Sequence, residues 1–301
     1  MLSVQIHGFV QLQADTLRVI NQEKSLGKGV WYPVEYLEAL QKDLKEKDGP
    51  RVQWMKEKEI CRLGFVDPKT FDRRDDFTFV AKAHIVASVA LKQLKDGLAL
   101  LECGNVVQLS LWSALHDYLG TEKFDALVGA VLPPLYLQSG AFILKDLYQG
   151  VPIKGEKDIQ PGDICSFKNI PQYRRKNPNG IAFAWNTICS QIGDSGPKFM
   201  GLGLSPAGES SAEIEKVFFN EFNKEPLDPY FYFAKSLAEK LVKSSLTGTL
   251  TWEEFQKVHS VDANGVQGRL VLKVLRPRLD RIQQLKNTSI HQLRKLIASW
   301  K

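Results

Sequence analysis

The stretch of the chain that decides its fold reads LALLECGNVVQLSLWSALHDYLG, from Leu98 to Gly120. A short apolar run opens it. A helical pattern follows from about Glu102, carried by Val106, Leu109, Ser113 and Leu115. Gly120 is the kind of residue at which a helix usually ends. The pattern therefore predicts a helix that starts beside Cys103 and stops at Gly120.

Cys103 stands at the start of this predicted helix, and that position matters for its chemistry. The free N–H groups and the positive end of the helix dipole favour the thiolate, which is the nucleophilic form of cysteine. The other interpretation is that Cys103 is a small buried residue beneath the helix, as many cysteines are. Position alone leaves both interpretations open.

Upstream of this stretch, the sequence predicts helices separated by loops. Residues 1–30 are expected to be mixed strand and loop. A helix is expected over 33–47, with Pro33 in its first turn, and a second one from about Val52. Residues 64–74 are expected to be a loop, and a further helix is expected over 78–95, with Gly97 as its stop.

Downstream, the pattern changes from helix to strand. Thr121 is expected to cap a short helix. After Pro134, short apolar runs alternate with turn signals, which predicts strands and hairpins. Helices are expected again from Ser210, near Asp228-Pro229 and at a capping box beginning with Thr251, followed by a hairpin strand over 270–274 and a final basic helix. Helices followed by an antiparallel sheet give an α+β fold.

Composition narrows the class of protein. The chain has 301 residues, 44% of them hydrophobic and 25% charged, which is typical of a globular protein of one large or two average domains. No apolar run is long enough to span a bilayer, and the start lacks a secretory signal. Four widely spaced cysteines fit a reducing compartment: Cys61, Cys103, Cys165 and Cys189. We therefore expect a cytoplasmic protein, with non-classical export left open.

Several catalytic templates do not occur in the sequence. It has no glycine-rich nucleotide-binding motif, no Gly-x-Ser-x-Gly and no His-Glu-x-x-His. The histidines are scattered along the chain: His7, His84, His116, His259 and His291. The sequence therefore predicts neither a metal site nor a cofactor.

The positive charge is concentrated at the end of the chain. Residues 266–301 contain nine basic side chains and one acid, Asp280. We expect an amphipathic helix that docks its apolar stripe on the body and leaves a solvated cationic face. The alternative is binding to an anionic partner, such as a membrane surface, a nucleic acid or an acidic protein.

Three motifs in series carry a family resemblance. The first runs from Lys92 through Glu102-Cys103 to Lys123-Phe124, the second is Pro161–Asn169, and the third is Asn186-Thr187-Ile188 with Gly201-Leu202-Gly203-Leu204. Together they resemble the bacterial spore-coat-type protein-glutamine gamma-glutamyltransferases, or transglutaminases, over about residues 60–206. The resemblance implies a papain-like (NlpC/P60-like) core over 61–206, with a cysteine-bearing helix packed on a small antiparallel sheet. Extensions over 1–60 and 207–301 would either form separate domains or wrap this core.

The resemblance also implies a reaction. The thiolate of Cys103 attacks the side-chain amide of a protein glutamine, ammonia leaves, and a thioester forms. A lysine amine then resolves the thioester to an isopeptide crosslink, or water resolves it and the glutamine is deamidated. The implied partners are therefore proteins that bear glutamine and lysine, and neither calcium nor another cofactor is implied.

The sequence departs from this family at two acid–base positions. Met200 stands where the family has a histidine, and Trp185 stands where it has an acidic residue. Glu102, directly before Cys103, is then the candidate acid–base partner. His116 lies about three and a half turns along the helix, too far to touch the thiol, and His84 is expected to be a packed or surface residue.

Phe183 and Trp185 alternate along a predicted strand, so they are expected either to pack in the core or to line a substrate groove. Two hypotheses follow for the whole chain. One is a slow acyltransferase, since a missing general acid–base partner lowers the rate by about 10²–10⁴. The other is a pseudoenzyme that keeps the fold as a protein-binding module.

Overall fold

The computed structural model describes residues 2–26, 28–46, 64–75, 77–129, 132, 134–138, 144, 146–177, 182–225, 248–259, 270–271 and 273–300. Cys61, the helix expected from Val52 and the helix expected at Asp228-Pro229 lie outside these residues. Among the described residues, no helix is long and apolar enough to cross a bilayer.

Helices and small sheets alternate in the first half of the chain. The elements are α1 (Leu2–Gln22), β1 (Gly29–Trp31), α2 (Pro33–Glu46), β2 (Phe71–Asp75), β3 (Thr78–Ala81), α4 (Ala87–Asp96), β4 (Leu98–Leu100), α5 (Cys103–Leu119), α6 (Thr121–Leu127) and β5 (Tyr136–Leu137). Strands β1 and β4 pair in parallel, and β2, β3 and β5 form an antiparallel sheet.

The second half contains the main sheet and its covering helices. The elements are β6 (Tyr148–Pro152), η1 (Glu156–Asp158), β7 (Ile164–Lys168), α7 (Tyr173–Lys176), β8 (Ala184–Gly193), β9 (Gly196–Met200), α8 (Ser211–Asn223), α11 (Trp252–His259), β10 (Lys273–Pro277), α12 (Leu279–Asn287), η2 (Ile290–Gln292) and α13 (Leu293–Ala298). The sheet order is β6-β10-β7-β8-β9, antiparallel throughout. The predicted mixture of helices with an antiparallel sheet, an α+β fold, is confirmed.

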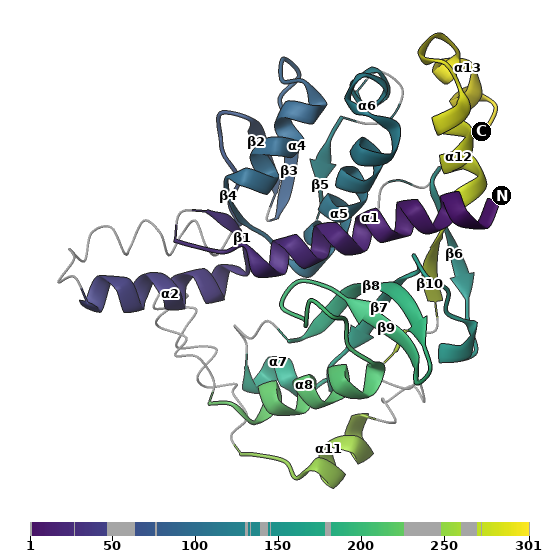
Figure 1. Ribbon diagram of the computed structural model, residues 1–301. Helices are drawn as coiled ribbons and strands as arrows, with labels where there is room; N and C mark the ends of the chain where they lie inside the picture. Colours follow the sequence, from purple (N-terminus) through teal and green to yellow (C-terminus); the bar gives the residue numbers. More distant parts are fainter. Residues whose placement is uncertain are drawn as a thin grey trace.

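Helix α5 is the centre of the molecule. Every side chain from Cys103 to Leu115 is buried, as is Tyr118, so this helix is apolar or tightly packed all round. Helix α1 lies along α5. It runs between the main sheet and a group of elements formed by β2, β3, β5, α4 and α6 (Figure 1). The N-terminus of α5 meets β8, while α7 and α8 lie on the other side of the sheet (Figure 1).

Several predicted elements are confirmed with their boundaries. Helix α2 begins at Pro33, as expected from the fixed φ of proline. Helix α5 ends where Gly120 adopts φ 84°, a backbone conformation that favours glycine. The hairpin of β8 and β9 turns at residues 194–195, and Thr251 and Glu254 form the expected capping box before α11.

Other expectations are wrong. Residues 2–22 form one helix instead of strand and loop, because Phe9, Leu17 and Ile20 lie at helical spacing and are buried. Residues 78–81 form a strand instead of the start of a helix, because Val80 and its neighbours pair with β2 and β5. Thr121 is the first residue of α6, and Gly120 holds the cap position.

The expected basic C-terminal helix is two helices, α12 and α13, separated by a short turn at Thr288-Ser289 and η2. The predicted apolar stripe is confirmed in part, since Ile282, Leu285, Leu293 and Ile297 are buried against the body. Binding of the basic segment to an anionic partner stays a prediction.

Strand β10 does not form a local hairpin. It lies between β6 and β7, more than a hundred residues away in sequence, with Val274 opposite Val151 and Leu275 opposite Ile164. Elements from both extensions thus contact the middle of the chain, α1 on α5 and β10 within the sheet. The boundaries drawn at residues 60 and 206 stay a prediction.

A buried ion pair holds β10 in place. The Arg276 guanidinium donates to both carboxylate oxygens of Asp163, at 2.8 and 2.7 Å, and to the backbone carbonyl of Asp158 at 2.8 Å. Asp163 is fully buried in the turn before β7, where it also accepts from the N–H of Gln160. Asp163 therefore both closes the turn before β7 and binds β10.

Replacing Arg276 tests this connection. Arg276→Met leaves Asp163 buried without its cation, and removing one partner of a buried pair costs about 3–5 kcal/mol of unfolding free energy. Urea unfolding followed by circular dichroism measures the loss. The exposed Arg294→Met is the matched control, expected to change the unfolding free energy by less than about 0.5 kcal/mol. Equal stability of the two variants would contradict the assigned role.

Candidate functional site

The site is built on the junction between β4 and α5. The backbone N–H of Leu101 donates to the carbonyl of Trp31 at 3.0 Å, which fixes the approach to the helix. Glu102 is the N-cap residue, and a reciprocal capping box joins it to Asn105. The fully buried Asn105 also donates to the carbonyl of Phe77 at 3.0 Å. Helix α5 therefore starts in a fixed place, with Cys103 as its first residue.

The sulfur of Cys103 lies against the part of β8 that pairs with β7 on one side and extends past the end of β9 on the other. Cys189 of β8 exchanges backbone hydrogen bonds with Gly162 and Asp163, on the β7 side. The backbone N–H and C=O groups of successive residues in a strand point alternately to its two sides. Those of Ala184 and Asn186 therefore point away from β7, to the side on which β9 pairs with β8. Strand β9 ends at Met200, opposite Ile188, and leaves these groups without a strand partner. The Cys103 thiol fills that position.

The contacts of the sulfur follow from this placement. The thiol donates to the carbonyl of Ala184 at 3.7 Å, and the side-chain amide of Asn186 donates to the sulfur at 3.3 Å. The backbone N–H groups of Asn186 and Gly104 lower the pKa of the thiol as well. One side-chain amide thus donates to the sulfur, and two backbone N–H groups favour negative charge on it.

Burial decides the protonation state of Cys103. The residue is 9% exposed, and burial raises the pKa of its thiol above the ordinary value, a shift that the N–H groups of Asn186 and Gly104 offset in part. The negative charge of Glu102 raises that pKa further. The free thiol form is therefore the resting state near pH 7.

Asn186 donates to the thiol, although the sequence predicts no chemistry for it beyond its place in the third motif. The signal that could have identified it is its place in the strand. Ala184 and Asn186 share one face of β8, and Trp185, between them, has the other. To recognise that this face lies next to Cys103, one must know that α5 contacts β8. No local sequence pattern predicts that contact.

Trp185 lies on the other face of β8. Its side chain is 2% exposed, tilts against the ring of Phe218 and donates from Nε1 to the carbonyl of Leu202 at 2.8 Å. Met200 is likewise 2% exposed. The indole and the thioether are closely packed, and neither can transfer a proton in place of the family's acid and histidine.

The turn after β9 is fixed from several directions. Asn21 of α1 donates to the carbonyl of Gly201 and accepts from the N–H of Gly203. The carbonyl of Leu202 accepts from the hydroxyl of Tyr32 as well as from Trp185. Burial, and then the charges of Cys103 and Glu35, raise the pKa of Tyr32, so this hydroxyl is a donor and not a base.

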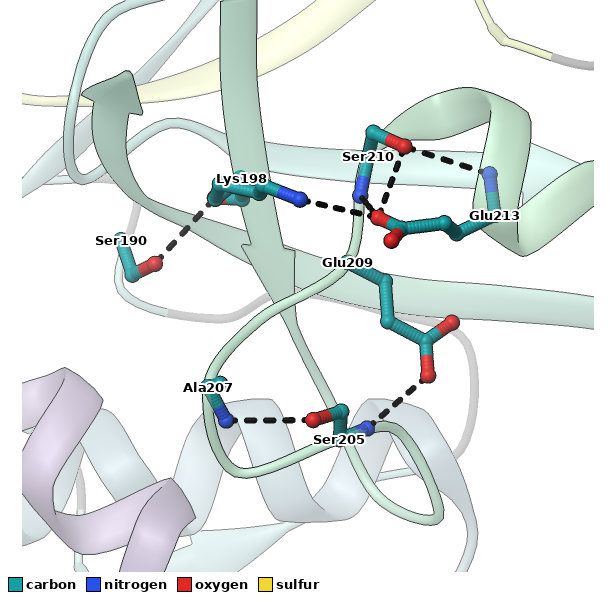
Figure 2. Close-up of polar contacts among 7 residues, drawn as sticks. All are labelled: Ser190, Lys198, Ser205, Ala207, Glu209, Ser210 and Glu213. Atoms are coloured by element: carbon teal, nitrogen blue, oxygen red, sulfur yellow. Dashed lines mark hydrogen bonds and ion pairs between the residues drawn. The ribbon is translucent and has the colours of Figure 1, made fainter. Parts of the chain in front are cut away.

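The loop that follows this turn is closed by its own side chains. Figure 2 shows Ser210 and Glu213 in a capping box at the start of α8, with Lys198 of β9 bound to the Glu213 carboxylate. The backbone N–H of Ser210, together with Lys198, lowers the pKa of Glu213 to about 2. Glu209 accepts from the N–H of Ser205 in the same loop (Figure 2). The site therefore has a firmly held edge on this side.

The two candidate histidines do not reach the thiol. His116 lies near the C-terminal end of α5, where its ring contacts Asp117 and Thr121 and meets Phe124 edge-on. His84 is exposed in the turn before α4. Among the described residues, no three His, Cys, Asp or Glu side chains come together as a metal site would require.

The two aromatic residues proposed for a groove are separated. Phe183 is partly buried beneath the guanidinium of Arg174, 3.4 Å from the ring centre. Trp185 reaches the wall of a cavity of about 330 Å³ between α2 and α8, with Glu35, Glu38 and Glu221 on its other walls. Substrate binding by either residue stays a prediction.

The sequence matches no protein-family model and no curated protein. Among the solved structures that are similar is a transglutaminase from Geobacillus stearothermophilus, without its C-terminal extension, with 13% sequence identity and a TM-score of 0.49 over 96% of this chain and 97% of that one.

The pH dependence of thiol alkylation tests the electrostatics of the site. Because a raised pKa keeps the thiol protonated, reaction of Cys103 with iodoacetamide should be slow at pH 7 and should accelerate through an apparent pKa above about 8.5, the value of a free thiol. Peptide mass spectrometry measures the rate at each cysteine.

Cys189 is an internal reference, because burial raises the pKa of its thiol to about 12; it should react more slowly than Cys103. The Cys103→Ala variant assigns the signal. An apparent pKa for Cys103 at or below about 8.5 would contradict the dominance of burial.

Proposed function

We propose that this chain transfers acyl groups from protein glutamine side chains through a thioester on Cys103. The observation that carries the proposal is the place of the Cys103 sulfur at the first residue of α5, where the side-chain amide of Asn186 donates to it at 3.3 Å and the backbone N–H groups of Asn186 and Gly104 lower the pKa of its thiol. A cysteine that only fills space needs no such donors. N–H groups aimed at a sulfur stabilise negative charge on it, and negative charge on sulfur is what the attacking form requires.

The reaction has two steps. In the first, the sulfur bonds to the carbonyl carbon of the glutamine amide, the carbon–nitrogen bond breaks, and the thiol proton leaves with the nitrogen as ammonia. In the second, the nitrogen of a lysine amine bonds to the same carbon, the carbon–sulfur bond breaks, and a proton from the amine restores the thiol. Water in place of the amine gives glutamate. Crosslinking and deamidation therefore share one intermediate.

Glu102 is the proposed proton carrier for both steps. It directly precedes Cys103, it is partly exposed, and its charge acts on the thiol. A carboxylate can accept the thiol proton as the sulfur attacks and can return it to the leaving nitrogen. Because the histidine position of the family holds Met200, we expect a rate about 10²–10⁴ below that of an enzyme with a full set of partners.

The substrate class rests on the sequence resemblance. The motifs around Cys103, Pro161–Asn169 and Asn186–Ile188 resemble those of protein-glutamine transglutaminases, and this resemblance motivates glutamine as donor and lysine as acceptor. The papain-like detail of the core, the cytoplasmic location and the bacterial type of the protein belong to the same proposal.

A second candidate function has an observation of its own. Cys103 is 9% exposed, burial raises its pKa, and Trp185 and Met200 close the two positions where acid–base residues would stand. These features favour a catalytically impaired protein that binds its partner without reacting. The two candidates differ in one outcome, whether an acyl group is ever transferred.

Amine incorporation separates the two candidates. The folded protein is incubated with a glutamine-rich acyl-donor protein such as casein and a fluorescent primary amine as acceptor, over hours, at pH 8. We expect slow labelling that is lost in Cys103→Ala. Labelling indistinguishable between wild type and Cys103→Ala would overturn the acyltransferase and leave the binding module.

The Glu102→Gln variant tests the proton carrier more sharply, because its effect on the pKa of the thiol and its effect on proton transfer would change the rate in opposite directions. Removing the negative charge should lower the apparent pKa of Cys103, since that charge raises it. Removing the proton acceptor should slow amine incorporation by about 10²-fold. A faster or unchanged transferase would show that Glu102 acts on the thiol only through its charge.

A further inference from the structure

The Asn186 side chain has a second partner on the neighbouring strand. Ser166 of β7 lies directly opposite Asn186 of β8, and its hydroxyl donates to Asn186 Oδ1 at 2.7 Å. Asn186 Nδ2 in turn donates to the Cys103 sulfur at 3.3 Å. A chain of two hydrogen bonds thus runs from Ser166 through the amide of Asn186 to the thiol.

The pairing geometry explains why these side chains meet. The backbone carbonyl of Ser166 accepts from the N–H of Val271, on the side of β7 away from β8. Ser166 and Asn186 therefore form the kind of antiparallel pair that exchanges no backbone bonds, in which the side chains lie closest. The short contact is a consequence of strand register.

The direction of the amide matters because its two ends differ. Nδ2 carries hydrogens that stabilise an anionic sulfur, whereas Oδ1 carries partial negative charge and would repel it. A neutral thiol tolerates either end, since it can donate to an oxygen. A hydroxyl that donates to Oδ1 holds that oxygen on the Ser166 side and leaves Nδ2 facing the sulfur.

We propose that Ser166 is a positioning residue, which fixes the amide of Asn186 so that its N–H group faces the Cys103 sulfur whenever that sulfur is anionic. Its part in catalysis rests on the proposed function, but its effect on the thiol does not. Ser166 therefore acts on the nucleophile through Asn186, without touching a substrate.

Two variants of equal shape isolate the hydroxyl. Ser166→Thr keeps it, and Ser166→Val replaces it with a methyl group, while both residues favour a strand. The readout is the apparent pKa of Cys103 from the pH profile of iodoacetamide alkylation, which a purely structural role would leave unchanged. Ser190→Ala is the control, because that hydroxyl donates to the carbonyl of Lys198, on the β9 side.

We expect Ser166→Val to raise the apparent pKa of Cys103 by about half to one pH unit, which makes alkylation about 3- to 10-fold slower at pH 8. Ser166→Thr should restore the wild-type profile, and Ser190→Ala should match it. Asn186→Asp, which places a carboxylate at the sulfur, should raise the apparent pKa further than Ser166→Val.

The inference is overturned if folded Ser166→Val has the wild-type profile, or if Ser166→Thr is as impaired as Ser166→Val. Should Ser166→Val not fold, Ser166→Ala takes its place with the same expected result. Amine incorporation is measured on the same samples. If Ser166→Val alters the pKa of Cys103 but the wild type transfers no amine, the positioning role is supported and the proposed function is overturned. If the wild type transfers amine but Ser166→Val leaves the pKa of Cys103 unaltered, the proposed function is supported and the positioning role is overturned.

Discussion

Helix α5 has no solvent face over most of its length, and that constraint organises the rest of the chain. A helix buried on all sides must be covered on all sides. Here α1 lies along it, α4 and α6 pack beside it, β5 covers part of it, and β8 meets its N-terminus. The chemistry follows from this arrangement, because a helix fixed so completely places its first residue, Cys103, at a defined point of the sheet edge.

That point is where β8 extends past the end of β9. The backbone groups of Ala184 and Asn186 have no strand partner there, and the thiol of Cys103 takes the place of one. The same placement has two opposing effects on the sulfur. Burial favours the neutral thiol, and the N–H groups of Asn186 and Gly104 favour the thiolate. Burial is the larger effect in the resting protein, so the proposed reaction requires this balance to change when a substrate binds.

Sequence patterns predicted the parts of the fold that depend on neighbours in the chain. Pro33, Gly120 and the turn residues of the β8–β9 hairpin act locally, and the elements they bound are where they were expected. Helix α1 was missed because its buried stripe includes a polar residue, Gln13, whose amide donates to the hydroxyl of Tyr148, 135 residues away. Strand β10 was misassigned for a similar reason, since its partners are β6 and β7 and not a local hairpin.

The residues of the candidate site also fall into two groups, those that a local sequence pattern or motif can indicate and those whose roles depend on distant contacts. Cys103 is a candidate because a helix start is a local feature with known chemistry, and Glu102 is one because of the family resemblance; the catalytic roles of both stay predictions. Asn186 and Ser166 were not predicted as site residues, because their roles depend on the register of β7 on β8 and on the contact of β8 with α5. Trp185 and Met200 were recognised as departures from the family, and the structure adds that the indole instead binds the turn carbonyl of Leu202.

If the proposed reaction occurs, Cys103 carries an acyl group as a thioester, which intact-protein mass spectrometry detects. The protein is incubated with a glutamine-containing peptide in the absence of amine, quenched in acid and weighed. We expect an adduct with the mass of the peptide less ammonia, located on Cys103 and released by hydroxylamine as a thioester is. A folded protein that shows no adduct on Cys103 after prolonged incubation with peptides of varied sequence would contradict the proposed reaction.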